Sequence, residues 1–98
     1  MNADLKARWI AALRSGEFHR GQGEFQDGDT FCPLGVLCRI SDAPLLDENG
    51  SDNYPYVSSV LSESGVDATQ VWIRNDFWGW GFEQTADWLE AALRAEGE

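Results

Sequence analysis

The chain has 98 residues, of which 43% are hydrophobic and 12% are aromatic. This length predicts one domain over residues 1–98, and the apolar content excludes an intrinsically disordered chain. No apolar run reaches the roughly 18 residues of a membrane-spanning helix, and the first residues lack the basic and apolar regions of a signal peptide. We therefore expect a cytoplasmic protein whose two cysteines are reduced.

The net charge of −10 comes entirely from the second part of the chain. Residues 1–39 contain five acids and five bases, whereas residues 40–98 contain twelve acids and two bases. Such a negative region disfavours direct contact with nucleic acid or a membrane and favours a partner with a basic surface. Simple solubility also explains this charge asymmetry.

The N-terminal segment predicts a helix over residues 4–15. Asn2 or Asp4 can cap its start, and Gly16 can end it in the left-handed conformation. The residues at helical spacing that indicate its buried face are Leu5, Trp9, Ala12 and Leu13.

Residues 17–31 are rich in glycine and predict a loop, with Asp27-Gly28 as the turn of a short hairpin. A buried helix is expected over residues 33–41, because Pro33 suits the first turn of a helix. Gly35 would let this helix pack closely against another element. The phenylalanines expected to anchor the loop on the core are Phe18, Phe25 and Phe31.

The rest of the chain predicts three further helical segments around two loops. A turn at 47–50 favours short strands near 45–46 and 54, and Pro55 can start a helix that Gly65 would stop. Asp67 and Gln70 form a capping-box pattern before a helix at 68–74, although the β-prone residues 71–73 allow a strand. A last helix is expected over 83–94. The predicted class is α+β, mostly helical with about four helices and a short hairpin or small antiparallel sheet.

Five blocks of sequence are spread over most of the chain: Trp9-x-x-Ala12-Leu13-Arg14-Ser15-Gly16-x-Phe18, Gly21-x-Gly23, Cys32-x-Leu34-Gly35-Val36-Leu37-Cys38, Asn75-Asp76 and Phe82-x-x-x-Ala86-Asp87-x-Leu89-Glu90. Together these blocks resemble a group of small, uncharacterised accessory proteins of bacteriophages and prophages. This resemblance implies a phage origin and a host-cell setting, and it brings no catalytic residues. The chain has Pro33 where a second cysteine is common in this group, and Gly81 where a serine helix cap is common.

Metal and cofactor chemistry has little basis in this composition. One histidine and two cysteines are too few for a structural zinc site, so no metal and no cofactor is expected. On a helix, Cys32 and Cys38 would lie about 240° apart and could not chelate one ion together. A cysteine hydrolase that uses Cys32 as nucleophile and His19 as base is an alternative, because a helix N-terminus stabilises a thiolate. The leading expectation is a protein that is not an enzyme.

A glycine-bearing loop suggests a second alternative, which is the sequestration of a small ligand or nucleotide. Backbone N–H groups of such a loop, together with a guanidinium, can hold a phosphate. The spacing matches neither the P-loop nor the dinucleotide motif, and glycines that only permit a turn explain the same pattern. The residues concerned are Arg20, Gly21, Gln22 and Gly23.

The aromatic segment 77–82 predicts a loop that binds a partner. Phe77 and Phe82 are expected in the core, whereas Trp78 and Trp80 are each followed by glycine and are candidates for an exposed binding hot spot. An acidic surface would steer a basic partner toward this loop. The carboxylates expected to contribute are Asp42, Asp47, Glu48, Asp52, Asp67 and Asp76, with Asp87 and Glu90 as further members.

The leading hypothesis is therefore a phage-encoded acidic binding protein that inhibits or redirects a host protein by occlusion. An anti-defence protein, such as an anti-CRISPR-like inhibitor or a nucleic-acid mimic, would fit this hypothesis.

Overall fold

The computed structural model describes residues 1–96 and confirms an α+β fold, with a mixed three-stranded sheet and five helices in that part of the chain. The sheet order is β1-β3-β2, with β1 parallel and β2 antiparallel to β3. The expected hairpin is thus present, and the parallel strand β1 adds to it. The elements are α1 (Ala3–Arg14), β1 (His19–Arg20), β2 (Gln26–Asp27), β3 (Thr30–Phe31), α2 (Pro33–Ile40), α3 (Tyr54–Leu61), α4 (Ala68–Asp76) and α5 (Phe82–Ala92).

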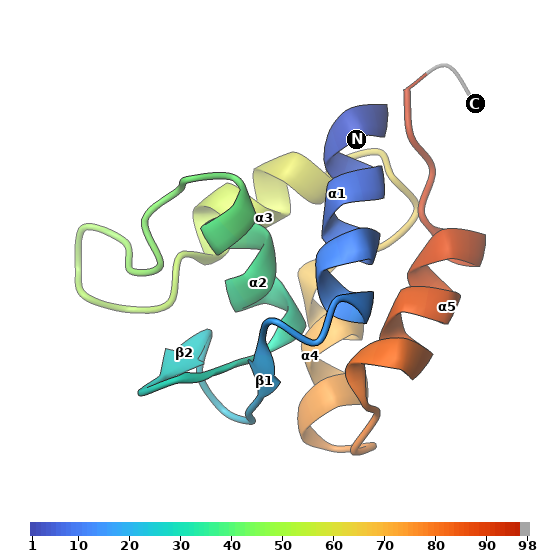
Figure 1. Ribbon diagram of the computed structural model, residues 1–98. Coiled ribbons are helices and arrows are strands. Elements are labelled where there is room, and N and C mark those ends of the chain that lie inside the picture. Colours follow the sequence, from blue (N-terminus) through green and yellow to red (C-terminus); the bar gives the residue numbers. More distant parts are fainter. Residues whose placement is uncertain (97–98) are drawn as a thin grey trace.

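Helix α2 lies at the centre of the fold. Every residue from Pro33 to Cys38 is buried, and α1, α3, α4 and β3 all contact this helix (Figure 1). The buried indole of Trp9 on α1 donates a hydrogen bond of 2.9 Å to the Pro33 carbonyl. This bond satisfies a polar atom that would otherwise be costly to bury.

Gly35 allows the hairpin to pack directly on α2. A Cβ atom at this position would lie 1.8 Å from the carbonyl oxygen of Phe25, so no side chain fits there. Phe25 itself is buried, and its ring meets Tyr54 edge-on with 4.9 Å between the ring centres. The close packing predicted for Gly35 is confirmed.

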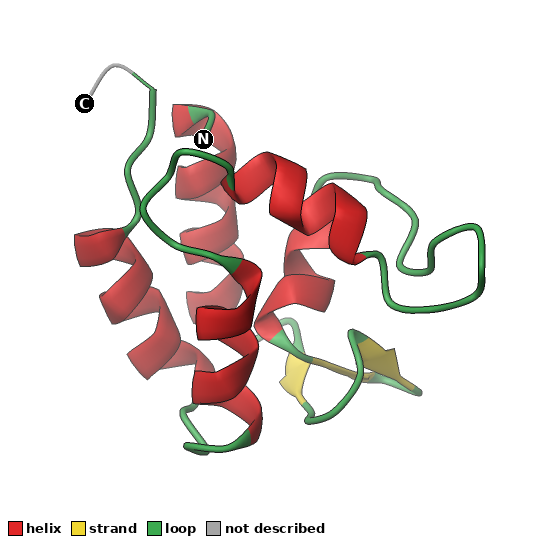
Figure 2. Cartoon of the chain, turned by 180° about the vertical axis from the view of Figure 1, so that it is seen from behind, coloured by secondary structure: helices red, strands yellow, loops and turns green. Residues whose placement is uncertain are grey.

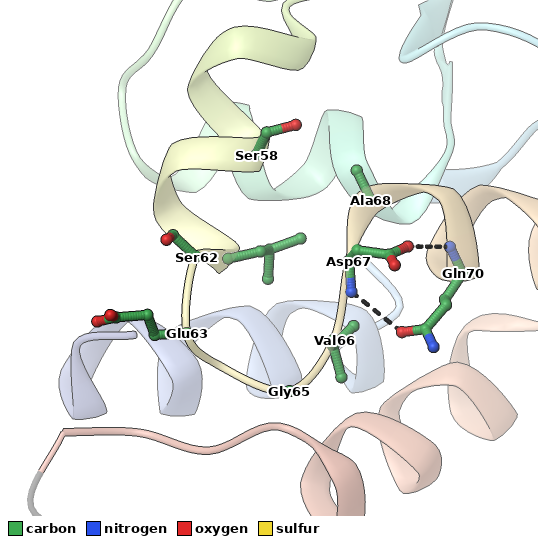
Figure 3. Close-up of a pocket in the computed structure, with 9 residues that line it drawn as sticks. Ser58, Ser62, Glu63, Gly65, Val66, Asp67, Ala68 and Gln70 are labelled. Atoms are coloured by element: carbon green, nitrogen blue, oxygen red, sulfur yellow. Dashed lines mark hydrogen bonds between the residues drawn. The ribbon is translucent and has the colours of Figure 1, made fainter.

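Local capping residues set where three of the helices begin. Asn2 accepts a hydrogen bond from the Leu5 amide at the start of α1. At the start of α4, Asp67 accepts from the Gln70 amide at 2.8 Å while the Gln70 side chain accepts from the Asp67 amide at 3.0 Å (Figure 3). Asn53 caps α3. The capping box is confirmed, and the alternative of a strand at 71–73 is wrong because these residues lie within α4.

Helix α5 packs against α1, and the chain after it returns to the N-terminus (Figure 2). The Arg94 amide donates to the Ser64 carbonyl at 2.7 Å, and the Glu96 amide donates to the Met1 carbonyl at 2.7 Å. Between the two helices, Arg14 of α1 forms ion pairs with Asp87 at 2.8 Å and with Glu90 at 2.6 Å, both on α5. Among residues 1–96, no helix has the length and apolar character needed to cross a membrane.

Candidate partner-binding site

The loop between α4 and α5 is a tight return that backbone hydrogen bonds hold in place. The Trp78 amide donates to the Ile73 carbonyl at 3.1 Å, and the Trp80 amide donates to the Arg74 carbonyl at 3.0 Å. Gly79 takes φ +70°, a conformation that favours glycine, and so lets the chain turn. Carbonyls of the last turn of α4 therefore fix the positions of both tryptophans.

Phe77 is on the surface, so its expected place in the core is wrong. Its side chain is 74% exposed because α4 ends at Asp76 and the next residue turns outward. The ring rests on Trp72, with 5.5 Å between the ring centres. Phe82 is half-buried and packs against the core as predicted.

Arg74 lies among three indole rings. Its guanidinium carbon is 4.1 Å from the ring centre of Trp88, 4.7 Å from that of Trp78 and 5.4 Å from that of Trp80. Trp80 stands between the other two rings, at 5.7 Å from Trp78 and 6.2 Å from Trp88. A guanidinium over an indole face is a favourable cation–π arrangement. We call Arg74, Phe77, Trp78, Trp80 and Trp88 the aromatic site.

The aromatic site combines exposed rings with fixed geometry. Trp78 is 56% exposed although Arg74 covers one side of its ring, so its accessible surface is on the remaining side. Trp80 is only half-buried. Rigid, partly exposed tryptophans lose little conformational freedom on binding, which is why they are common at the centres of protein interfaces. The arrangement is suited to binding and contains no nucleophile.

Three members of this site were not predicted as binding residues from the sequence, namely Arg74, Phe77 and Trp88. Arg74 is four residues before Trp78, and this helical spacing is a weak signal because Trp78 lies beyond the helix. Trp88 lies within α5, where an aromatic residue usually indicates a core position. The sequence therefore did not mark it as part of a binding site.

The predicted acidic residues do not form one surface. Asp47, Glu48 and Asp52 lie in the 41–53 loop, which projects from the fold at a different end from the 77–81 loop (Figures 1 and 2). Asp67 and Asp76 lie at opposite ends of the nine-residue α4, about 13 Å apart at 1.5 Å per residue. Asp42 lies in the same loop just after α2 and is exposed, whereas Asp87 and Glu90 lie on α5 and pair with Arg14.

Asp67 also lines a hollow between α3 and α4, with a volume of about 280 Å³ (Figure 3). Its carboxylate is committed to the cap of α4, and Gln70 is committed to the same cap. The buried Ser64 hydroxyl next to this hollow donates to the Leu61 carbonyl at 2.6 Å. Asp67, Gln70 and Ser64 therefore serve the turn between the two helices.

One comparison with known proteins identifies a family. Residues 1–53 match the family described as a domain of unknown function, DUF8296. The chain belongs to this family. No curated protein and no solved structure matches the chain. The DUF8296 segment ends immediately before α3, so the whole aromatic site lies outside it.

Within the DUF8296 segment, the loop proposed for phosphate binding is instead turned toward α4. Arg20 donates from Nε to the side-chain oxygen of Asn75 at 2.9 Å and from Nη2 to the Asn75 carbonyl at 2.6 Å. Gln22 donates to the same carbonyl at 3.2 Å, and Asn75 donates to the Gly21 carbonyl at 2.8 Å. These bonds commit Arg20 and Gln22 to the last turn of α4, immediately before the aromatic loop.

The two thiols of the DUF8296 segment are buried and free. Burial raises the pKa of Cys32 to about 12, even though amides of the first turn of α2 lower it, and burial raises the pKa of Cys38 to about 11. His19 is exposed on β1. A protonated, inaccessible thiol is a poor nucleophile. Within residues 1–96, no three His, Cys, Asp or Glu side chains come together as a possible metal site.

Proposed function

We propose that this protein is a phage-encoded acidic binding protein that docks on a host protein through the aromatic site and inhibits or redirects it by occlusion. The observation that carries the proposal is the exposure of two consecutive aromatic residues, 74% for Phe77 and 56% for Trp78, on a loop whose backbone is fixed. Large exposed rings in a soluble chain favour a contact surface. Such a protein needs no catalytic residues.

The charge of the chain adds a preference for partner type. The net charge of −10 repels nucleic acid and attracts basic protein surfaces. Because the predicted acids are divided between the 41–53 loop and the two ends of α4, the proposal assigns contact to the aromatic site. The carboxylates then steer association and contribute less to the final affinity. The phage resemblance supports a host defence component as the target.

Comparative capture from a host lysate at low salt tests this proposal. The wild-type chain is compared with a Phe77→Ser/Trp78→Ala variant and with Ser59→Ala, which changes an exposed side chain on α3 away from the aromatic site. We expect a host protein that the wild type and Ser59→Ala both retain and that the double variant loses. With the purified partner, the double variant should weaken the Kd by about 30-fold or more, as expected for a hot spot.

Two outcomes would contradict the proposal. The first is the absence of any partner for the wild type at low salt. The second is equal retention by the double variant, because exposed rings that can be removed without effect do not form the contact. A partner that is bound with an on-rate independent of salt would remove the steering role of the acids only.

A further inference from the structure

A second cavity lies between the β2–β3 hairpin and the 41–53 loop, with a volume of about 510 Å³. This volume falls in the range of about 300–1,000 Å³ that is usual for ligand sites. We call it the hairpin cavity. Every residue that lines it belongs to the DUF8296 segment, unlike the aromatic site. The lining residues that matter here are Glu24, Gln26, Leu45, Leu46, Ser51 and Asp52.

The cavity is a slot between two stretches of chain. Glu24 just before β2, Gln26 on β2 and Gly28 in the hairpin turn form one wall. Leu45 and Leu46 belong to the opposite wall, and Leu46 is 55% exposed. An aliphatic side chain in this slot would cover apolar surface that now faces solvent.

The charge of the slot is purely negative. It is lined by the carboxylates of Glu24 and Asp52 and by no basic residue. In the part of the chain that the structure describes, the ion pairs join Arg8 and Arg14 to other acids, and neither of these two carboxylates takes part. The charge of Asp52 also contributes to the raised pKa of Cys38 and of Tyr54.

We infer that the hairpin cavity binds arginine or lysine side chains of a basic peptide segment. These side chains combine an aliphatic stem with a cationic head, which matches a leucine wall beside unpaired carboxylates. This site is a second docking surface, carried by the DUF8296 segment and independent of the aromatic site.

An NMR titration of the ¹⁵N-labelled full chain tests the inference. The probe is an acetylated and amidated octapeptide of alternating leucine and arginine, and its counterpart has glutamate in place of arginine. We expect the basic peptide to shift the amide signals of residues 24–28 and 45–52 in a saturable manner, and the acidic peptide to leave them unchanged. The variant Phe77→Ser/Trp78→Ala should bind the basic peptide as the wild type does.

A matched pair of charge variants separates the site from the net charge. Glu24→Gln/Asp52→Asn should weaken the Kd of the basic peptide by about tenfold or more. Glu17→Gln/Glu63→Gln removes two exposed negative charges away from the cavity and should change the Kd by less than about twofold.

Any of four results would overturn the inference. These are no shift at millimolar peptide, shifts confined to residues 76–88, equal weakening by both charge variants, and equally tight binding of free L-arginine amide at the same amides. The last result would show a site for small cations instead of a peptide. None of them bears on the capture experiment with the Phe77→Ser/Trp78→Ala variant, so the two proposals fail separately.

Discussion

The guanidinium carbon of Arg74 lies 4.1 Å from the ring centre of Trp88, and this contact joins the end of α4 to the middle of α5. The Nε atom of Arg74 is buried and has no hydrogen-bond partner, while Nη1 donates to the Gln70 carbonyl at 3.1 Å. An unsatisfied donor on a cation is costly, so the indole faces must supply much of the compensation. Arg74 thereby holds Trp78 and Trp80 in place.

Replacement of Arg74 by alanine should lower the free energy of unfolding by about 1–2 kcal/mol, because the cation–π contacts and the packing of the arginine stem are both lost. Arg74→Lys should recover only part of this loss, since an ammonium group does not stack on indole as a planar guanidinium does. Urea denaturation followed by tryptophan fluorescence gives both values. An unchanged midpoint for Arg74→Ala would mean that the rings hold the loop without the cation.

Asn75 should be among the most sensitive polar positions of the fold. It is fully buried, accepts from Arg20 and donates to the Gly21 carbonyl. Asn75→Ala leaves these partners unsatisfied and should cost about 2–3 kcal/mol. The measurement is the free energy of unfolding by urea. As a control, Asn49→Ala in the exposed part of the 41–53 loop should cost less than about 0.5 kcal/mol.

The contact of Arg20 with Asn75 also allows a test of the alternative function, the sequestration of a nucleotide. If Arg20 serves only to hold α4, Arg20→Ala should lower the melting temperature without any ligand, by about 4–8 °C for each kcal/mol lost. A panel of nucleotides should then leave the melting temperature of the wild type unchanged. A nucleotide that raises it, and fails to do so for Arg20→Ala, would restore the ligand hypothesis.

The helices were predictable because their signals are local. Asn2, Pro33 and the Asp67–Gln70 capping box each act within four residues, so their effects can be read from neighbouring positions. The turn at 47–50 was also predictable from neighbouring residues. Of the strands expected beside it, the first is only a single bridge between Leu46 and Asp52, and the second, near residue 54, is wrong because Tyr54 begins α3.

The candidate site was less predictable because it depends on contacts between distant residues. Arg20 and Asn75 are 55 residues apart, and a glycine-bearing loop with an arginine has the same local pattern whether it binds phosphate or a helix end. From the sequence, Trp78 and Trp80 were both only candidates for exposure. The outward position of Phe77 depends on where α4 ends, and helix boundaries are the least certain part of a sequence-based assignment.

Gly35→Ala should be severely destabilising, by about 3 kcal/mol or more, because the added methyl group would overlap the backbone of Phe25. The hairpin would have to move away from α2, which should also expose Phe25. Gly81→Ser is a suitable control, since an added Cβ meets nothing within 4 Å there, and a serine cap on α5 should raise stability by a few tenths of a kcal/mol. Thermal denaturation of both variants checks the prediction. A melting temperature for Gly35→Ala close to that of the wild type would refute the close packing.

Alkaline pH should destabilise the fold through the two thiols and Tyr54. Burial raises the pKa of Cys32 from 9.0 to about 12, that of Cys38 from 9.0 to about 11, and that of Tyr54 from 10.0 to about 12. Below pH 9 these groups are protonated in both states, so their contribution to stability is fully present. Between pH 9 and about 11 the unfolded chain releases both thiol protons while the folded chain retains them, so the free energy of unfolding falls as pH rises.

Each thiol can contribute a slope of up to about 1.4 kcal/mol per pH unit in this range. Urea denaturation at a series of pH values from 8 to 11 measures the slope for the wild type and for Cys32→Ala/Cys38→Ala. The double variant will be less stable at every pH because two buried side chains are shortened, but its slope should be distinctly flatter. The slope, and not the absolute stability, isolates the contribution of thiol ionisation to the free energy of unfolding. An identical slope in the two proteins would mean that other groups cause the alkaline loss, and that the native thiols ionise as readily as those of the unfolded chain.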